Sequence, residues 1–127
     1  MKRILVVDDE FDLSGTLRAI LEGEGYCTET CANGKEALDR LQSARPDLVL
    51  MDVMMPILGG LDVLRTMRDT PGLKSVPVIL MSAAAPRVKQ EDYGWQAFLR
   101  KPFTLPLLVK TVERLIGPAR GGDSEKA

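Results

Sequence analysis

Apolar residues along the chain fall into five short runs, which are separated by longer segments with helical spacing. Residues 3–7, RILVV, are largely apolar, as is typical of a strand buried on both faces. A more polar run, at 26–30, is expected at an edge of the sheet. Further strands are predicted at 47–52, 76–82 and 97–100.

The segments between these strands carry apolar residues at the spacing of amphipathic helices. Helices are expected around residues 13–21, 33–41, 61–69 and 105–116. Asn33 followed by Glu36 is typical of a capping box at the start of the second helix. Segment 83–96 contains Pro86 and has poor apolar periodicity, so the fourth helix is expected to be short or irregular.

Strands that alternate with helices predict a parallel sheet with right-handed crossovers and helices on both faces. Five such units in a chain of 127 residues indicate an α/β fold, the three-layer flavodoxin-like (βα)5 with strand order 2-1-3-4-5. We expect one domain over residues 1–117, followed by a flexible tail or linker stub at 118–127.

The composition is that of an ordinary globular domain, with 45% hydrophobic and 28% charged residues. A net charge of −1 gives no reason to expect nucleic acid or anionic lipid as a partner. The apolar runs are far shorter than the ~20 residues of a membrane span. The first residues meet acids too early for a signal peptide, so we expect a cytoplasmic protein without membrane insertion.

Cysteine and histidine usage excludes several kinds of site. Cys27 and Cys31 lie four residues apart on a predicted strand, roughly 13 Å, which is too far for a disulfide. The chain has no histidine, which argues against a zinc site and rules out catalytic triads with a histidine base. For the same reason this chain cannot carry its own phosphohistidine.

Acidic and polar side chains stand where the predicted strands end. Asp8 and Asp9 follow the first strand, Asp52 ends the third, Ser82 ends the fourth and Lys101 follows the fifth. In the order 2-1-3-4-5, the ligand crevice lies between the carboxyl ends of the first and third strands. Taken singly, these residues could be a helix cap, a strand-end serine or a surface lysine. Together they predict a site.

This combination has a chemical logic. Clustered carboxylates repel one another, and a hard cation such as Mg²⁺ relieves that repulsion. An aspartate beside the cation can attack phosphorus as a nucleophile. A lysine ammonium and a serine hydroxyl can bind phosphoryl oxygens.

The segments that carry these residues resemble the receiver domain of two-component response regulators over residues 2 to about 117. The matching segments are ILVVDDE, PDLVLMDVMMP, VPVILMSA and KPF. The resemblance implies Asp52 as the phosphoacceptor and Asp9 as a direct Mg²⁺ ligand, with Asp8 acting nearby, partly through water. It also implies the backbone carbonyl of Met54 as a metal ligand.

The resemblance further implies that Ser82 and Phe98 are the switch residues and that Lys101 is the family's site lysine, followed by a cis peptide to Pro102. The implied phosphodonor is a phosphohistidine on a histidine kinase or histidine phosphotransfer protein. The implied output face, formed by helix 4, strand 5 and helix 5, acts on a downstream protein or output domain. Gly59 departs from the family pattern, which usually has an acid there.

Three classes of function are weighed. A phospho-accepting signalling switch, which catalyses its own phosphorylation and slow dephosphorylation without being a conventional enzyme, fits the complete acidic site. A phosphorylation-independent interaction module, or pseudo-receiver, is the alternative. An aspartate-nucleophile phosphatase needs an Asp-x-Asp motif, but Val53 and Met54 follow Asp52. DNA binding has no recognition helix or basic stripe to support it.

Overall fold

Five parallel strands form a single sheet in the order β2-β1-β3-β4-β5 in the computed structural model, which describes residues 1–119. This is the predicted order. The strands are β1 (Arg3–Val7), β2 (Cys27–Cys31), β3 (Leu48–Asp52), β4 (Val78–Ser82) and β5 (Ala97–Arg100). The helices are α1 (Phe11–Gly23), α2 (Gly34–Ser43), α3 (Gly60–Arg68), α4 (Gln90–Tyr93) and α5 (Leu105–Ile116).

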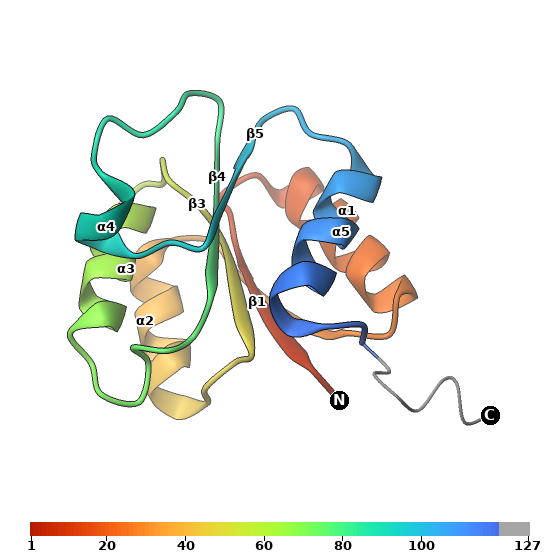
Figure 1. Cartoon of the computed structure of the whole chain (residues 1–127), viewed down its shortest axis with the longest axis horizontal. Coiled ribbons are helices and arrows are strands. Elements are labelled where there is room, and N and C mark those ends of the chain that lie inside the picture. Colours follow the sequence, from red (N-terminus) through yellow and green to blue (C-terminus); the bar gives the residue numbers. More distant parts are fainter. Residues whose placement is uncertain (120–127) are drawn as a thin grey trace.

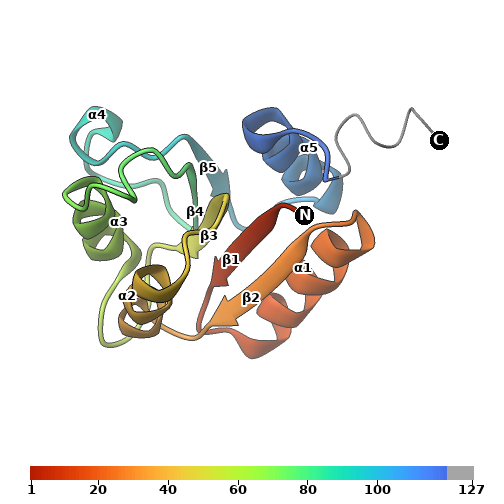
Figure 2. The ribbon, with the colours of Figure 1, turned by 90° about the horizontal axis from the view of Figure 1, so that it is seen from below.

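The helices cover both faces of the sheet, which confirms the three-layer α/β architecture. Figures 1 and 2 show α1 and α5 on one face and α2, α3 and α4 on the other. Two separate hydrophobic clusters fill the space between the sheet and these two layers. Every residue of β3 and of β4 is buried, because both faces of these central strands are covered.

Side-chain caps define where two of the helices begin. The Asn33 side chain accepts a hydrogen bond from the Glu36 amide at 2.9 Å, and the Glu36 carboxylate accepts one from the Ala32 amide at 3.0 Å. This reciprocal pair confirms the capping box predicted for the start of α2. Thr104 accepts from the Leu107 amide at 3.3 Å and caps α5 in the same way.

Strand boundaries differ from the predicted ones by one or two residues. The second strand begins at Cys27 because the Tyr26 amide donates to the Leu21 carbonyl and belongs to the turn that closes α1. The fourth strand begins at Val78 rather than at Val76, whose amide donates to Leu73 in the preceding turn. Turn hydrogen bonds compete with the sheet at both places, and apolar periodicity does not report them.

Helix α4 is a single turn, Gln90–Tyr93, which confirms the expectation of a short fourth helix. It ends at Gly94, whose positive φ of 77° stops the helix. Trp95 follows directly and is 8% exposed within the cluster that includes α3 and β4 residues. Trp95 therefore anchors this segment to the core.

The ends of the described chain are held together at one edge of the molecule. The Lys2 ammonium donates to the Pro118 carbonyl at 3.0 Å, and the N-terminus lies beside the end of α5 (Figure 2). Most of the predicted tail, residues 120–127, falls outside the described residues, so the proposed boundary at 117 stays a prediction. Within residues 1–119, no helix has the length and apolar character that a membrane crossing requires.

Candidate functional site

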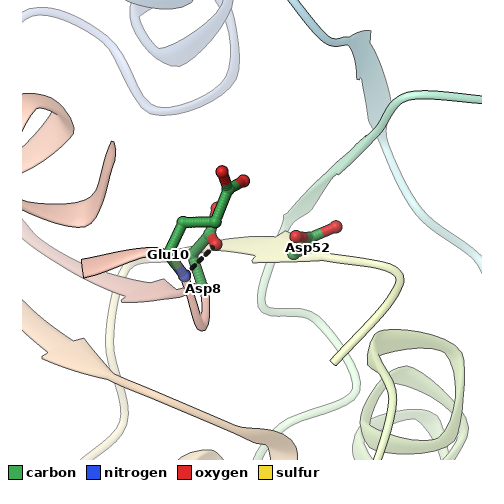
Figure 3. Close-up of side chains that lie close together, drawn as sticks. All are labelled: Asp8, Glu10 and Asp52. Atoms are coloured by element: carbon green, nitrogen blue, oxygen red, sulfur yellow. Dashed lines mark hydrogen bonds between the residues drawn. The ribbon is translucent and has the colours of Figure 1, made fainter. Parts of the chain in front are cut away.

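The side chains singled out in the sequence converge at the carboxyl edge of the sheet. Asp8 directly follows β1, and Asp52 and Ser82 are the last residues of β3 and β4. Asp8, Asp52 and Ser82 are all buried, at 2%, 6% and 6% exposure. Figure 3 shows the Asp8 and Glu10 carboxylates, from the turn after β1, near Asp52 at the end of β3.

The backbone around Asp52 is held from two sides. The Val53 amide donates to the Met81 carbonyl at 2.9 Å, which extends the pairing of β3 with β4 beyond the acid. On the other side, the Gly60 amide donates to the Val53 carbonyl at 2.9 Å. A Cβ at position 60 would collide with the Asp52 carbonyl oxygen, so only glycine allows α3 to start this close to the site. The result is a carboxylate fixed at the mouth of the crevice.

Lys101 connects the acidic residues. Its ammonium donates to Asp8 at 3.1 Å, to Glu10 at 2.9 Å and to Asp52 at 3.0 Å. An ammonium has three N–H groups, so all of them have acceptors here. The Lys101 amide donates to the Ser82 carbonyl at 2.8 Å, and the Lys101–Pro102 peptide is cis, as the resemblance implied.

One lysine does not neutralise this group. Three carboxylates against one ammonium leave a formal charge of −2. Burial raises the pKa of the Asp8 carboxyl, which its hydrogen bonds to the Glu10 amide and to Lys101 only partly offset. For Lys101, burial alone would lower the pKa, but hydrogen bonds to Glu10, Asp52 and Asp8 hold it above its usual value. The site therefore carries more negative than positive charge.

The carboxylates fit a hard divalent cation. One oxygen each from Asp8, Glu10 and Asp52 lies within 4.8 Å of the others. Oxygen ligands and surplus negative charge suit Mg²⁺, which keeps part of its shell for water and phosphate oxygens.

Glu10 is the member of this group that sequence reasoning missed. It precedes the first residue of α1, where an acid is as well explained by the helix dipole, so its position alone gave no signal. Asp9, expected beside the metal, is exposed and lines a pocket of about 220 Å³ together with Asp8, Thr30 and Glu36, whereas the cavity beside Asp52 is not lined by Asp9. Its role as a metal ligand stays a prediction.

Met54 and Ser82 lie beside Asp52, whereas Phe98 lies further back on β5. The Met54 amide donates to the Asp52 carboxylate at 3.3 Å, and the Met54 side chain is 74% exposed. The Ser82 hydroxyl accepts from the Ala84 amide at 3.3 Å. Phe98 is half-buried on β5, opposite Leu80 of β4, and packs against the core cluster.

An open cavity of about 460 Å³ adjoins the acidic group on the side of α3 and the loop after β4. Asp52, Ser82 and Lys101 line it, so a substrate entering the cavity reaches the aspartate, the hydroxyl and the ammonium together. The other walls are mostly apolar, formed by Val53, Met54, Leu61 and residues 83–86.

Comparison with known protein families identifies the family of this chain. The profile of the response regulator receiver domain matches residues 4–113. The chain belongs to this family. Receiver domains are the parts of two-component signal-transduction systems that work with histidine kinases and downstream effectors, and the resemblance stated from the four sequence segments is confirmed.

Two groups of relatives differ in length. The chain is 34% identical over 121 residues to the polar-differentiation response regulator DivK of Brucella anthropi, covering 93% of this chain and 98% of that protein. It is 41% identical over 117 residues to the response regulator MprA of Mycolicibacterium vanbaalenii, covering 90% of this chain but 50% of that protein. The chain therefore spans nearly all of one relative and about half the length of the other.

Solved structures of receiver domains have the same fold. The response regulator TrrA of Thermotoga maritima, in complex with Mg²⁺–BeF, matches with a TM-score of 0.82 and 36% identity over 91% of this chain and 99% of that one. The receiver domain of the sensor histidine kinase PA1611 of Pseudomonas aeruginosa matches with a TM-score of 0.84 and 30% identity, over 91% of this chain and 98% of that one. That structure has a magnesium ion coordinated in its active-site cleft.

Proposed function

We propose that this receiver domain is a phosphorylation switch that accepts a phosphoryl group on Asp52. The observation that carries the proposal is the position of Asp52: a buried carboxylate, bonded to Lys101, at the mouth of a 460 Å³ cavity. Burying a carboxylate is costly unless it is paired, and Lys101 supplies the partner that keeps Asp52 ionised and nucleophilic. A phosphodonor that enters the cavity meets a fixed nucleophile.

The reaction is a transfer between a donor and the aspartate. An oxygen of the Asp52 carboxylate attacks phosphorus and forms a P–O bond, while the bond from phosphorus to the donor breaks. With a phosphohistidine donor, the broken bond is P–N and the electron pair stays on the imidazole, which leaves and takes up a proton. With acetyl phosphate, the broken bond is P–O and acetate leaves.

The surrounding side chains have distinct tasks in this proposal. Lys101, already 3.0 Å from Asp52, supplies positive charge to a phosphoryl oxygen, and the Ser82 hydroxyl donates to another. Mg²⁺ held by the acidic residues would neutralise charge that develops on the phosphoryl oxygens. Asp8, Glu10 and Asp52 are the residues grouped closely enough to hold it, and Asp9 and the Met54 carbonyl are the further ligands that the resemblance implies.

The proposed output follows from the added charge. A phosphoryl group brings about −1.5 to −2 charges at pH 7 and three acceptor oxygens. Ser82 and Phe98 respond by moving inward, which shifts the equilibrium of the face formed by α4, β5 and α5. The partners on either side are a histidine kinase or histidine phosphotransfer protein and a downstream protein or output domain.

Acetyl phosphate tests the proposal directly. Protein incubated with Mg²⁺ and acetyl phosphate should gain the mass of one phosphoryl group, and EDTA should prevent the gain. Asp52→Asn should remain unmodified, while Asp9→Asn and Glu10→Gln compare the two candidate metal ligands. A wild-type protein that gains no mass would instead support the pseudo-receiver alternative, in which the same face binds a partner without phosphorylation.

A further inference from the structure

The loop between β4 and α4, residues 83–89, carries a cation whose position the acidic site does not explain. This loop arches from the end of β4 over the side of the sheet that bears α3 (Figure 1). Its first residues are three alanines and Pro86, which offer no side-chain hydrogen bonds. Arg87 is the next residue, and it lines the same cavity as Asp52.

Arg87 is distinguished among the cavity residues by what it can donate. Among the residues lining the cavity, only Ser82, Lys101 and Arg87 have side chains that can donate a hydrogen bond to an anion. Lys101 already shares its three N–H groups among three carboxylates. Arg87 is exposed, and within residues 1–119 no carboxylate forms an ion pair with it.

Charge balance shows why this matters. The acidic group has a formal charge of −2, which one divalent cation would neutralise. A phosphoryl group on Asp52 then adds about −1.5 to −2 charges with no further cation among the acidic residues. The apolar cavity walls strengthen the attraction between opposite charges and make an unpaired one costly. A guanidinium that can enter the cavity meets this need with two parallel hydrogen bonds.

Building on the proposed phosphorylation of Asp52, we propose that Arg87 folds into the cavity and binds the phosphoryl group once it is attached. The contact links the phosphoryl group to α4, because Arg87 lies three residues before Gln90, the first residue of that helix. Pulling Arg87 inward therefore repositions the short α4 segment. In this chain, where the fourth helix is a single turn, Arg87 would couple phosphorylation of Asp52 to the position of that helix.

Other cations near the cavity are less well placed. Arg100 donates to the Ala83 carbonyl at 3.2 Å, which holds its side chain at the base of the loop. Lys89 lies two residues beyond Arg87 in the same loop, but it does not line the cavity. Lys89 has the same charge and similar exposure, so it is a matched control for general electrostatic effects.

Binding of beryllofluoride with Mg²⁺, a mimic of the phosphoryl group, tests the proposal when followed by ¹⁹F NMR. Arg87→Gln should weaken binding by at least about tenfold, because losing even one of the two hydrogen bonds between ionised groups is expected to have an effect of that size. Lys89→Gln should bind like the wild type, and Arg87→Lys should fall in between because lysine lacks the planar fork. The difference between Arg87→Gln and the wild type should shrink at high salt.

Limited proteolysis gives a second readout that does not depend on affinity. Trypsin cleaves after arginine and lysine, so both Arg87 and Lys89 of this exposed loop are targets. Saturating beryllofluoride should slow cleavage after Arg87 in the wild type, and cleavage after Lys89 in Arg87→Gln should be slowed less than in the wild type.

The outcomes separate this inference from the proposed function. If the wild type binds beryllofluoride and gains a phosphoryl group, but Arg87→Gln binds as tightly as the wild type, the role of Arg87 is wrong and the phosphoacceptor stands. Equal weakening by Arg87→Gln and Lys89→Gln also overturns it, because it shows a general effect of loop charge. A wild type that neither binds beryllofluoride nor gains a phosphoryl group overturns both.

Discussion

At the scale of single residues, Met54 and Ala84 set what a water molecule meets beside a phosphorylated Asp52. Both line the cavity, and neither offers a strong hydrogen bond. Hydrolysis of the acyl phosphate needs an oriented water, so we expect slow to moderate self-dephosphorylation. Met54→Asn should hasten the decay about fivefold, the effect of one hydrogen bond of about 1 kcal/mol.

Phosphoprotein decay after removal of acetyl phosphate, followed by intact mass, measures this rate. Met54→Leu is the matched control, since it keeps an apolar side chain of similar size and should decay like the wild type. An unchanged rate in Met54→Asn, in protein that is phosphorylated normally, would contradict the argument.

The two thiols should differ sharply in reactivity. Cys27 is exposed, whereas Cys31 is buried and burial raises the pKa of its thiol to about 11. A thiol reagent at pH 8 should therefore modify Cys27 in the folded protein and leave Cys31 until unfolding, as measured by time-resolved absorbance. Cys27→Ser should remove the fast phase only. A fast phase that survives in Cys27→Ser would show that Cys31 is accessible.

The Cys31 thiol also gives stability a dependence on alkaline pH. Its folded pKa lies above the ordinary value of 9.0, so the unfolded chain loses this proton first as pH rises. The stability that depends on the neutral thiol is complete below about pH 9 and is lost between about pH 9 and 11. In Cys31→Ala, this part of the alkaline decline in the free energy of unfolding should be absent.

Sequence reasoning at the residue scale located most of the site, but not all of its contacts. Asp8, Asp9, Asp52, Ser82 and Lys101 were predicted to meet because strand ends in a parallel sheet share one edge. All of them except Asp9 line the cavity or bond to Lys101. Glu10 was missed because its contact depends on where the Lys101 ammonium lies in the folded protein. The spacing of residues along the sequence does not give that position. The position of Arg87 at the cavity was also not predicted, because the sequence of an irregular loop does not indicate where a side chain points.

At the scale of the helices, glycines in α1 and α3 have opposite roles. Gly15 lies exposed in α1, and a Cβ there would meet nothing within 4 Å. Gly15→Ala should raise the free energy of unfolding by about 0.5–1 kcal/mol, because alanine is the better helix former. Gly60 lies at the start of α3, and a Cβ there would collide with the Asp52 carbonyl oxygen. Gly60→Ala should therefore lower the free energy of unfolding by about 1–3 kcal/mol.

Urea unfolding, monitored by circular dichroism, measures the free energy of unfolding of both variants. Gly60→Ala should also slow phosphorylation, since the backbone of Asp52 must move to admit the methyl group, whereas Gly15→Ala should leave it unchanged. A Gly60→Ala protein as stable and as readily phosphorylated as the wild type would show that α3 does not position the aspartate.

Sequence patterns predicted the elements better than their ends. The central strands were predicted because burial on both faces requires a continuous run of apolar residues. Helix α5 was predicted because its apolar residues recur at helical spacing. The brevity of α4 was predicted from Pro86 and from scarce apolar residues. What stabilises that segment was not predictable, because it depends on Arg68 of α3, whose guanidinium donates to the Gly94 carbonyl at 2.7 Å and to the Val76 carbonyl at 3.0 Å.

At the scale of the whole molecule, β5 connects the acidic crevice to the segment that precedes this strand. Ser82 and Lys101 lie at the carboxyl ends of β4 and β5, and Phe98 and Trp95 lie successively further back along the same segment. Trp95 is the only tryptophan of the chain and is 8% exposed against the core. A shift of β5 or α4 therefore changes the environment of one identifiable chromophore.

Tryptophan emission should consequently report the switch. Adding beryllofluoride with Mg²⁺ should change the Trp95 emission, because an inward movement of Ser82 and Phe98 alters the packing three residues away. Ser82→Ala should blunt the change by removing the hydroxyl that follows the phosphoryl mimic, and Asp52→Asn should abolish it by removing the attachment point. An emission spectrum that stays the same, in protein whose ¹⁹F NMR spectrum shows bound beryllofluoride, would mean that the site and the α4–β5 face are not coupled.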